Sequence, residues 1–81
     1  MNKPELENPK QFLLRILNKK VKITLRSNLE YIGILESVDE YFNVLLSQSI
    51  EYVKNEEQGY IGELLIRCNN VIFIKEINII L

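Results

Sequence analysis

The chain has 81 residues, enough for one small domain, and 47% of them are hydrophobic, as in a folded protein. Ten basic and eleven acidic residues give a net charge of −1, which is unlike a protein that coats nucleic acid by bulk charge. There is no histidine and only one cysteine, Cys68, which excludes an intrachain disulfide and argues against a zinc site or a histidine-assisted nucleophile. We therefore expect neither a metal nor a cofactor.

The N-terminal segment predicts neither a signal peptide nor a membrane anchor. No apolar run approaches the ~20 residues of a membrane span, and the first ten residues lack the apolar core of a signal peptide. We expect an intracellular protein with no membrane contact. Residues 1–7 are polar and contain Pro4, so they are expected to form a flexible arm before a single domain at residues 8–81.

The first predicted element is a helix of about ten residues that begins at Pro9. Asn8 is a favourable N-cap, proline is favoured at the first helical position, and Gln11 falls where it completes a capping box. One face of this helix carries Phe12, Leu13, Ile16 and Leu17. A helix this short is not stable alone, so we expect it to pack on an apolar surface.

Five strands are predicted after the helix, because the apolar period changes to two. Gly33, in the middle of the second strand, indicates a bend, a bulge or a close backbone approach. The charged segment 54–59 is expected to be an exposed loop. The expected strands cover residues 19–26, 29–38, 44–53, 60–68 and 71–77. Sequential strands usually pair antiparallel, so the sequence predicts an all-β fold: a short helix and a bent five-stranded sheet forming a small open barrel.

The last predicted strand is apolar on both faces. Val71 and Phe73 are expected to point to one face, and Ile72 and Ile74 to the other. Either the barrel and helix of the same chain cover both faces, or the strand pairs with another subunit. Such edge-to-edge pairing between barrels is heterologous and can close into a ring.

Two predicted loops carry residue types that recognise single-stranded RNA. Segment 39–43 offers Asp39, Tyr41 and Asn43, and segment 67–69 offers Arg67 and Asn69. Aromatic rings and guanidinium planes stack on bases, and an asparagine amide can bond a base edge. Taken one at a time, these residues also fit ordinary turn chemistry, a half-buried aromatic ring and a surface ion pair. Their spacing alone does not bring the two loops together.

These segments resemble the two signature motifs of the Sm/Lsm family. The stretch "VKITLRSNLEYIGILESVDEYFNVLL" resembles the first motif, with Gly33, Asp39 and Asn43 at the expected places. The stretch "GELLIRCNNVIFI" resembles the second, with its Arg-x-Asn core at Arg67 and Asn69. The resemblance covers essentially residues 8–77. Two positions depart from it, because Asn28 and Glu40 stand where the family usually has glycine; asparagine is the least costly replacement, and Glu40 adds a negative charge.

The resemblance implies an Sm fold in which the fourth strand of one subunit pairs with the fifth strand of the next in a heteroheptameric ring. Uridine-rich single-stranded RNA would pass along the lumen. Tyr41 would stack on a base, Asn43 would bond its edge, and Arg67 would lie against the same nucleotide. Asn69 completes the RNA-binding set, and Asp39 and Gly33 would shape the loops. The expected subunit interface comprises Leu64, Ile66, Ile72 and Ile74.

The family also implies a non-enzymatic function. It suggests a core subunit of spliceosomal snRNPs in pre-mRNA splicing, located in the nucleus after assembly in the cytoplasm. Expected partners are Sm E, Sm G, D-type Sm proteins and a uridine-rich snRNA, with no small-molecule substrate. One alternative is the sixth Lsm protein, whose ring acts on U6 snRNA or in mRNA decay, and which typically has glycine where Cys68 stands. Another is a barrel that serves mainly as an assembly scaffold. An enzyme built on Glu36, Asp39 and Glu40 lacks supporting groups.

Overall fold

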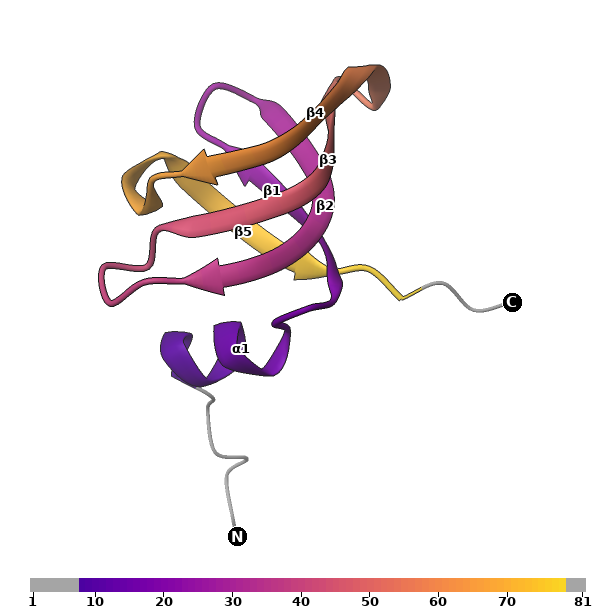
Figure 1. Ribbon diagram of the computed structural model, residues 1–81. Helices are drawn as coiled ribbons and strands as arrows, with labels where there is room; N and C mark the ends of the chain where they lie inside the picture. Colours follow the sequence, from indigo (N-terminus) through magenta and orange to yellow (C-terminus); the bar gives the residue numbers. More distant parts are fainter. Residues whose placement is uncertain (1–7, 79–81) are drawn as a thin grey trace, which may run out of the picture.

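The structure, a computed structural model, describes residues 8–78 and shows one helix followed by five strands (Figure 1). The predicted N-terminal arm at residues 1–7 lies outside the described residues, as do residues 79–81. In chain order the elements are α1 (Pro9–Arg15), β1 (Lys20–Leu25), β2 (Leu29–Val38), β3 (Val44–Val53), β4 (Glu56–Ile66), the 3-10 turn η1 (Cys68–Asn70) and β5 (Val71–Glu76). The predicted order of elements is confirmed.

Helix α1 begins as predicted but is shorter. The side chain of Asn8 accepts a hydrogen bond from the backbone N–H of Gln11 at 2.8 Å, and the side chain of Gln11 accepts one from the N–H of Asn8 at 3.4 Å. The helix has seven residues rather than about ten, and the chain turns away through Asn18, whose φ of 65° lies in the left-handed region that asparagine tolerates. Leu13 and Ile16 are buried, so packing stabilises this short helix.

The strands form one antiparallel sheet in the order β4-β3-β2-β1-β5, so β4 and β5 are its two edges. The sheet bends around a single core, and α1 covers one end of the resulting open barrel (Figure 1). The predicted fold class is therefore confirmed. The buried apolar residues are Leu13, Ile16, Val21, Ile23, Tyr31, Leu35, Val44, Leu46 and Ile66.

Gly33 lies where the backbone of β3 comes close to β2, and its lack of a side chain permits this approach. The pairing register with β3 shifts there, because Ile32 pairs with Ile50 whereas Ile34 pairs with Ser47. A Cβ atom on Gly33 would come within 2.8 Å of the carbonyl oxygen of Ser47. The predicted close backbone approach is confirmed, together with a register irregularity, but Gly33 lies in the middle of β2 and not in either candidate RNA loop.

The prediction of a charged loop at residues 54–59 is wrong. Val53 pairs with Glu56 across a two-residue turn, and residues 56–59 belong to β4. Lys54 and Asn55 have φ values of 51° and 66°, as a type I′ hairpin turn requires. The fourth strand also ends earlier than predicted, at Ile66, because residues 68–70 form η1.

A β-bulge overturns the predicted alternation in β5. Thr24 of β1 pairs with Phe73 whereas Leu25 pairs with Val71, so Ile72 is an extra residue without a partner on β1. Val71 and Ile74 pack against the core, while Ile72 and Phe73 are 59% and 53% exposed. Val71 and Phe73 therefore do not share a face, because the bulge rotates the chain between them.

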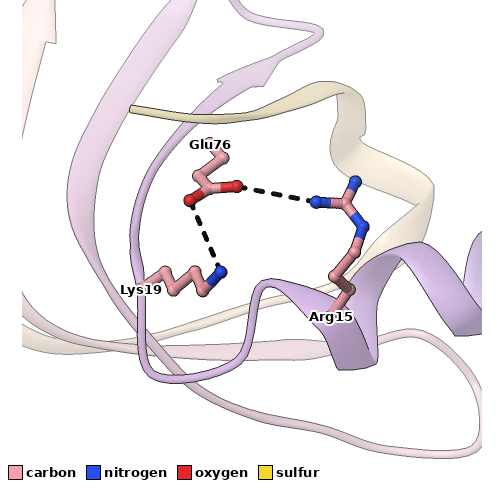
Figure 2. Close-up of polar contacts among 3 residues, drawn as sticks. All are labelled: Arg15, Lys19 and Glu76. Carbon is pink, nitrogen blue, oxygen red and sulfur yellow. Dashed lines mark ion pairs between the residues drawn. The ribbon is translucent and has the colours of Figure 1, made fainter. Parts of the chain in front are cut away.

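Ion pairs link helix α1 to the edge strand β5. Figure 2 shows Glu76, at the end of β5, between Arg15 of α1 and Lys19 just before β1. The N···O distances are 3.7 Å to Arg15 and 3.8 Å to Lys19. Both cations are about half exposed, so these pairs contribute at most ~1 kcal/mol and mainly fix the position of the helix end.

Candidate nucleic-acid interface

The carboxylate of Asp39 organises the loop between β2 and β3. Its Oδ1 accepts hydrogen bonds from the N–H of Tyr41 at 2.8 Å and of Asn43 at 2.9 Å, and its Oδ2 accepts one from Nδ2 of Asn43 at 2.9 Å. The hydrogen bond from the Asn43 side chain is the main reason why the pKa of Asp39 lies below its ordinary value, followed by the backbone N–H of Asn43. The charged carboxylate therefore holds this loop closed.

The substitution of Glu40 for the family glycine does not distort this loop. The left-handed residue of the loop is Phe42, with φ of 66°, and Glu40 is not among the residues with positive φ. Glycine at position 40 is thus not needed for backbone conformation. At the β1–β2 turn, by contrast, Asn28 has φ of 71°, which explains why asparagine replaces glycine there.

Asn43 joins the two candidate loops. Its side-chain Oδ1 accepts a hydrogen bond from the backbone N–H of Cys68 at 3.0 Å, while its Nδ2 donates to Asp39. These two contacts fix the orientation of the amide. One N–H of the half-buried amide is left, so the group can offer a hydrogen-bond donor to a base.

The second loop is a tight turn held from two sides. The N–H of Asn70 donates to the carbonyl of Arg67 at 3.0 Å. From the turn after β1, the backbone N–H of Arg26 donates to the carbonyl of Asn70 at 2.9 Å, and Nε of Arg26 donates to the carbonyl of Asn69 at 2.8 Å. Sequence reasoning missed Arg26, because it reads as one more polar residue of an alternating strand. Only the pairing of β1 with β5 reveals it.

The structure brings most of the predicted RNA-binding residues together. Hydrogen bonds connect the loop of Asp39 and Asn43 to the turn that carries Arg67 and Asn69. Tyr41 is 68% exposed, and Arg67 and Asn69 are exposed as well. These side chains are therefore accessible to a ligand, and the backbone beneath them is fixed.

The four residues expected at a subunit interface lie in different environments. The side chain of Ile66 is only 4% exposed and belongs to the core, so Ile66 would meet a neighbour mainly through its backbone on the free edge of β4. Leu64 and Ile74 are half-buried against the core, whereas Ile72 is exposed. The interface predicted from the sequence does not include the other large exposed apolar residues of the two edge strands. These are Tyr60, Ile61 and Leu65 on β4 and Phe73 on β5.

The described part of the chain was compared with two further kinds of feature, a metal-binding cluster and a membrane-spanning helix. Within residues 8–78, no group of three or more His, Cys, Asp or Glu side chains is placed to hold a metal ion. Over the same residues, no helix has the length and apolar character needed to cross a membrane.

The sequence matches known proteins of one family. The LSM domain matches residues 11–76. Small nuclear ribonucleoprotein F of Dictyostelium discoideum is 43% identical over 79 residues, covering 96% of this chain and 87% of that protein. LSM complex subunit lsm6 of Schizosaccharomyces pombe is 37% identical over 71 residues, covering 88% and 95%.

Solved structures agree with the sequence matches. The Sm protein of Pyrococcus abyssii, determined in complex with a uridine heptamer, superposes with a TM-score of 0.83 at 30% identity, covering 88% of this chain and all of that one. A heptameric archaeal Sm protein superposes with a TM-score of 0.75 at 31% identity, covering 83% and 97%. With the LSM domain spanning most of its length and the Sm fold around both motifs, the chain belongs to the Sm/Lsm family.

Proposed function

We propose that the chain is an RNA-binding subunit of a heteroheptameric Sm ring, the core of spliceosomal snRNPs in pre-mRNA splicing. The observation that carries this proposal is the hydrogen bond between Asn43 and Cys68, which joins both motif loops into one site. The structural relatives support the ligand and the assembly, since one was solved with a uridine heptamer and another as a heptamer.

The fixed amide of Asn43 favours uridine as the recognised base. Its remaining N–H is a donor, so it pairs with a carbonyl oxygen of the base edge and not with an amino group. Uridine offers O4 where cytidine offers an amino group. Tyr41 supplies an exposed ring for stacking and Arg67 an exposed guanidinium, each suited to a single-stranded nucleotide. Asn69 and Asp39 would hold the loops in shape.

The edges of the sheet support ring assembly. Exposed apolar side chains lie on both edge strands, with Leu65 and Ile61 on β4 and Ile72 and Phe73 on β5. Unprotected apolar edges are unusual in a monomer, and pairing of β4 with the β5 of the next subunit would cover them. The proposed neighbours are Sm E, Sm G and D-type Sm proteins. The proposed location is the nucleus, after cytoplasmic assembly, and the function is non-enzymatic.

The sixth Lsm protein, in a ring that binds U6 snRNA or acts in mRNA decay, is the second candidate. The higher identity to small nuclear ribonucleoprotein F, 43% against 37% for lsm6, favours the Sm ring. Cys68, at a position where that Lsm protein typically has glycine, favours it too. Native mass spectrometry of the chain with Sm or Lsm partners, with sequencing of the co-purified RNA, distinguishes these two rings.

The decisive experiment measures ring assembly and RNA binding in the double variant Tyr41→Ala, Arg67→Ala and compares both with the wild type. The proposal expects the variant to enter rings with its partners as the wild type does, and these rings to bind a uridine tract more weakly. Lys54→Ala, in the β3–β4 turn away from both loops, is the control and should leave both properties unchanged. Unchanged RNA affinity in the double variant would instead support a scaffold function.

A further inference from the structure

Arg26 lies in the tight turn between β1 and β2 and bonds the second candidate loop, residues 67–70. It follows the last residue of β1 and opens the three-residue turn to β2, in which the N–H of Asn28 donates to the carbonyl of Leu25 at 2.9 Å. The left-handed Asn28, with φ of 71°, completes this tight turn. The backbone that carries Arg26 is therefore fixed between two strands of the sheet.

Two hydrogen bonds connect Arg26 to the turn that carries Arg67 and Asn69. The backbone N–H of Arg26 donates to Asn70, and its Nε donates to the carbonyl of Asn69 at 2.8 Å, across 43 positions of sequence. The backbone bond is available to any residue except proline, but the Nε bond needs the planar guanidinium. On the opposite side the turn is held by Asn43, through Cys68.

We propose that Arg26 is a positioning residue of the RNA site. The β1–β2 turn then belongs to this site, together with the β2–β3 loop and the turn before β5. By holding the Asn69 carbonyl, Arg26 limits the turn to one arrangement and so fixes how Arg67 and Asn69 face the base. This inference rests on the proposed RNA-binding function. It differs from a purely electrostatic role, in which the positive charge of Arg26 would attract phosphates and a lysine would serve equally well.

The test uses three variants in the ring assembled with its partner subunits: Arg26→Lys, Arg26→Gln and the control Lys54→Gln. Each ring is titrated at several salt concentrations with a uridine tract and with tracts in which one uridine at a time is replaced by cytidine. The proposal expects both Arg26 variants to lose about three- to tenfold of the discrimination against cytidine at one position of the tract, the amount that one hydrogen bond supports. Their salt dependence should match that of the wild type and of Lys54→Gln.

Two outcomes would overturn the proposal. In the first, Arg26→Lys keeps full discrimination against cytidine, while in Arg26→Gln the salt dependence of RNA affinity is weaker than in the wild type. The expected decrease in the slope is about 0.7, the value for one lost phosphate contact on a single strand. The second is a loss of thermal stability in the Arg26 variants without any change in base discrimination, which would indicate a merely structural role.

Amide hydrogen exchange separates this inference from the proposed function. In the chain without RNA, the N–H groups of Asn70 and Cys68 should exchange faster in both Arg26 variants than in Lys54→Gln, because the turn has lost a support. Unchanged exchange contradicts the positioning role even if the ring binds RNA. Failure of the wild-type ring to bind uridine tracts contradicts the proposed function, whatever the exchange shows.

Discussion

The side-chain oxygen of Asn43 accepts a hydrogen bond from the backbone N–H of Cys68 at 3.0 Å, joining two loops that are 25 positions apart in the sequence. The same amide donates to Asp39 on the other side. A single side chain therefore couples the loop after β2 to the turn before β5. A residue suited to reading a base is at the same time part of the framework of its site.

Replacement of Asn43 by alanine should destabilise the protein even without RNA. The variant loses the bonds to Cys68 and Asp39, and we expect the free energy of unfolding to fall by about 1–2 kcal/mol, as for one or two partly exposed hydrogen bonds. Urea denaturation measures this change. Asn78→Ala, an exposed asparagine beyond β5, is the matched control and should leave the midpoint within error. Equal midpoints for both variants would contradict the bridging role.

Acid should weaken the loop through Asp39. Its pKa is lower in the folded protein than in the unfolded chain, so its charged form contributes stability above the unfolded pKa of ~3.9, and this contribution is lost as the pH falls through the lower folded value. Asp39→Asn should therefore be less stable than the wild type near neutral pH, and the difference should shrink as the pH falls below the unfolded pKa of ~3.9. Thermal unfolding across this range measures it.

Glu40→Gln serves as the control for the acid experiment, since it neutralises the adjacent carboxylate. It should keep the stability of the wild type near neutral pH, because the hydrogen bonds that hold the loop are accepted by Asp39. A constant difference between Asp39→Asn and the wild type down to pH 2 would rule out the linkage.

Alanine at Gly33 should strain the close approach of β2 and β3. The added Cβ would lie 2.8 Å from the carbonyl oxygen of Ser47 and 3.0 Å from Cα of Ser49, both backbone atoms that cannot rotate away. We expect a loss of about 1–3 kcal/mol, as for other overpacked sites, and a larger loss for Gly33→Val. Ser37→Ala, at an exposed position of the same strand, is the control. Wild-type stability of Gly33→Ala in urea denaturation would show that the sheet adjusts without cost.

Alkaline pH should destabilise the core through Tyr31. Its pKa is raised to about 12, first by burial, then by the hydrogen bond that its hydroxyl donates to Glu51 at 2.8 Å and by the charge of that carboxylate. Because the folded pKa exceeds the ordinary value of ~10, the stability linked to Tyr31 is complete below pH ~10 and is lost as the pH rises towards 12.

Measuring stability between pH 10 and 12 tests this linkage in two variants. Tyr31→Phe should remove the loss that Tyr31 causes between pH 10 and 12. Glu51→Gln should lower the pKa of Tyr31 only in part, because burial remains, and NMR titration of the Tyr31 ring measures that shift. The same alkaline loss in Tyr31→Phe as in the wild type would disprove the assignment.

RNA binding should require assembly. Stacking on one aromatic ring is worth ~1–3 kcal/mol and a hydrogen bond to a charged group adds ~1.5–3 kcal/mol. The middle of the summed range corresponds to a dissociation constant of about 1 mM, and its upper end to tens of micromolar at best. Several sites in a ring gain affinity through effective concentration. The isolated chain should therefore show no measurable binding to a uridine tract at physiological salt. Tight binding by a chain verified as monomeric during the titration would refute this.

The sequence predicted the elements that depend on local chemistry. The capping box at Asn8 and Gln11, the order of the strands and the close backbone approach at Gly33 follow from residue types and spacing, and the structure confirms them. It could not predict the turn at Lys54 and Asn55, because lysine gives no signal for a left-handed conformation. The residues that follow, Glu56, Glu57, Gln58 and Gly59, look like a loop, but they belong to β4, and three of them (Glu56, Glu57 and Gly59) pair with β3.

The candidate site was predictable in part. The residue types at Tyr41, Asn43 and Arg67 indicated RNA, and resemblance to the family placed them in two motifs. The sequence could not reveal that Asn43 bonds Cys68 or that Arg26 holds Asn69, since both contacts depend on strands that are distant in sequence. Nor could it predict that Phe73 is exposed, because a bulge leaves no signature in the order of apolar residues.

The bulge at Ile72 has a consequence for any strand that adds to the free edge of β5. A regular edge repeats every two residues, so a strand paired to it can slip by two and still find partners for its backbone groups. The extra residue interrupts that repeat once, and it places the apolar side chains of Ile72 and Phe73 side by side in sequence at the interruption. Only one alignment matches both halves of the edge. The bulge thus fixes the register in which a partner strand can pair with β5.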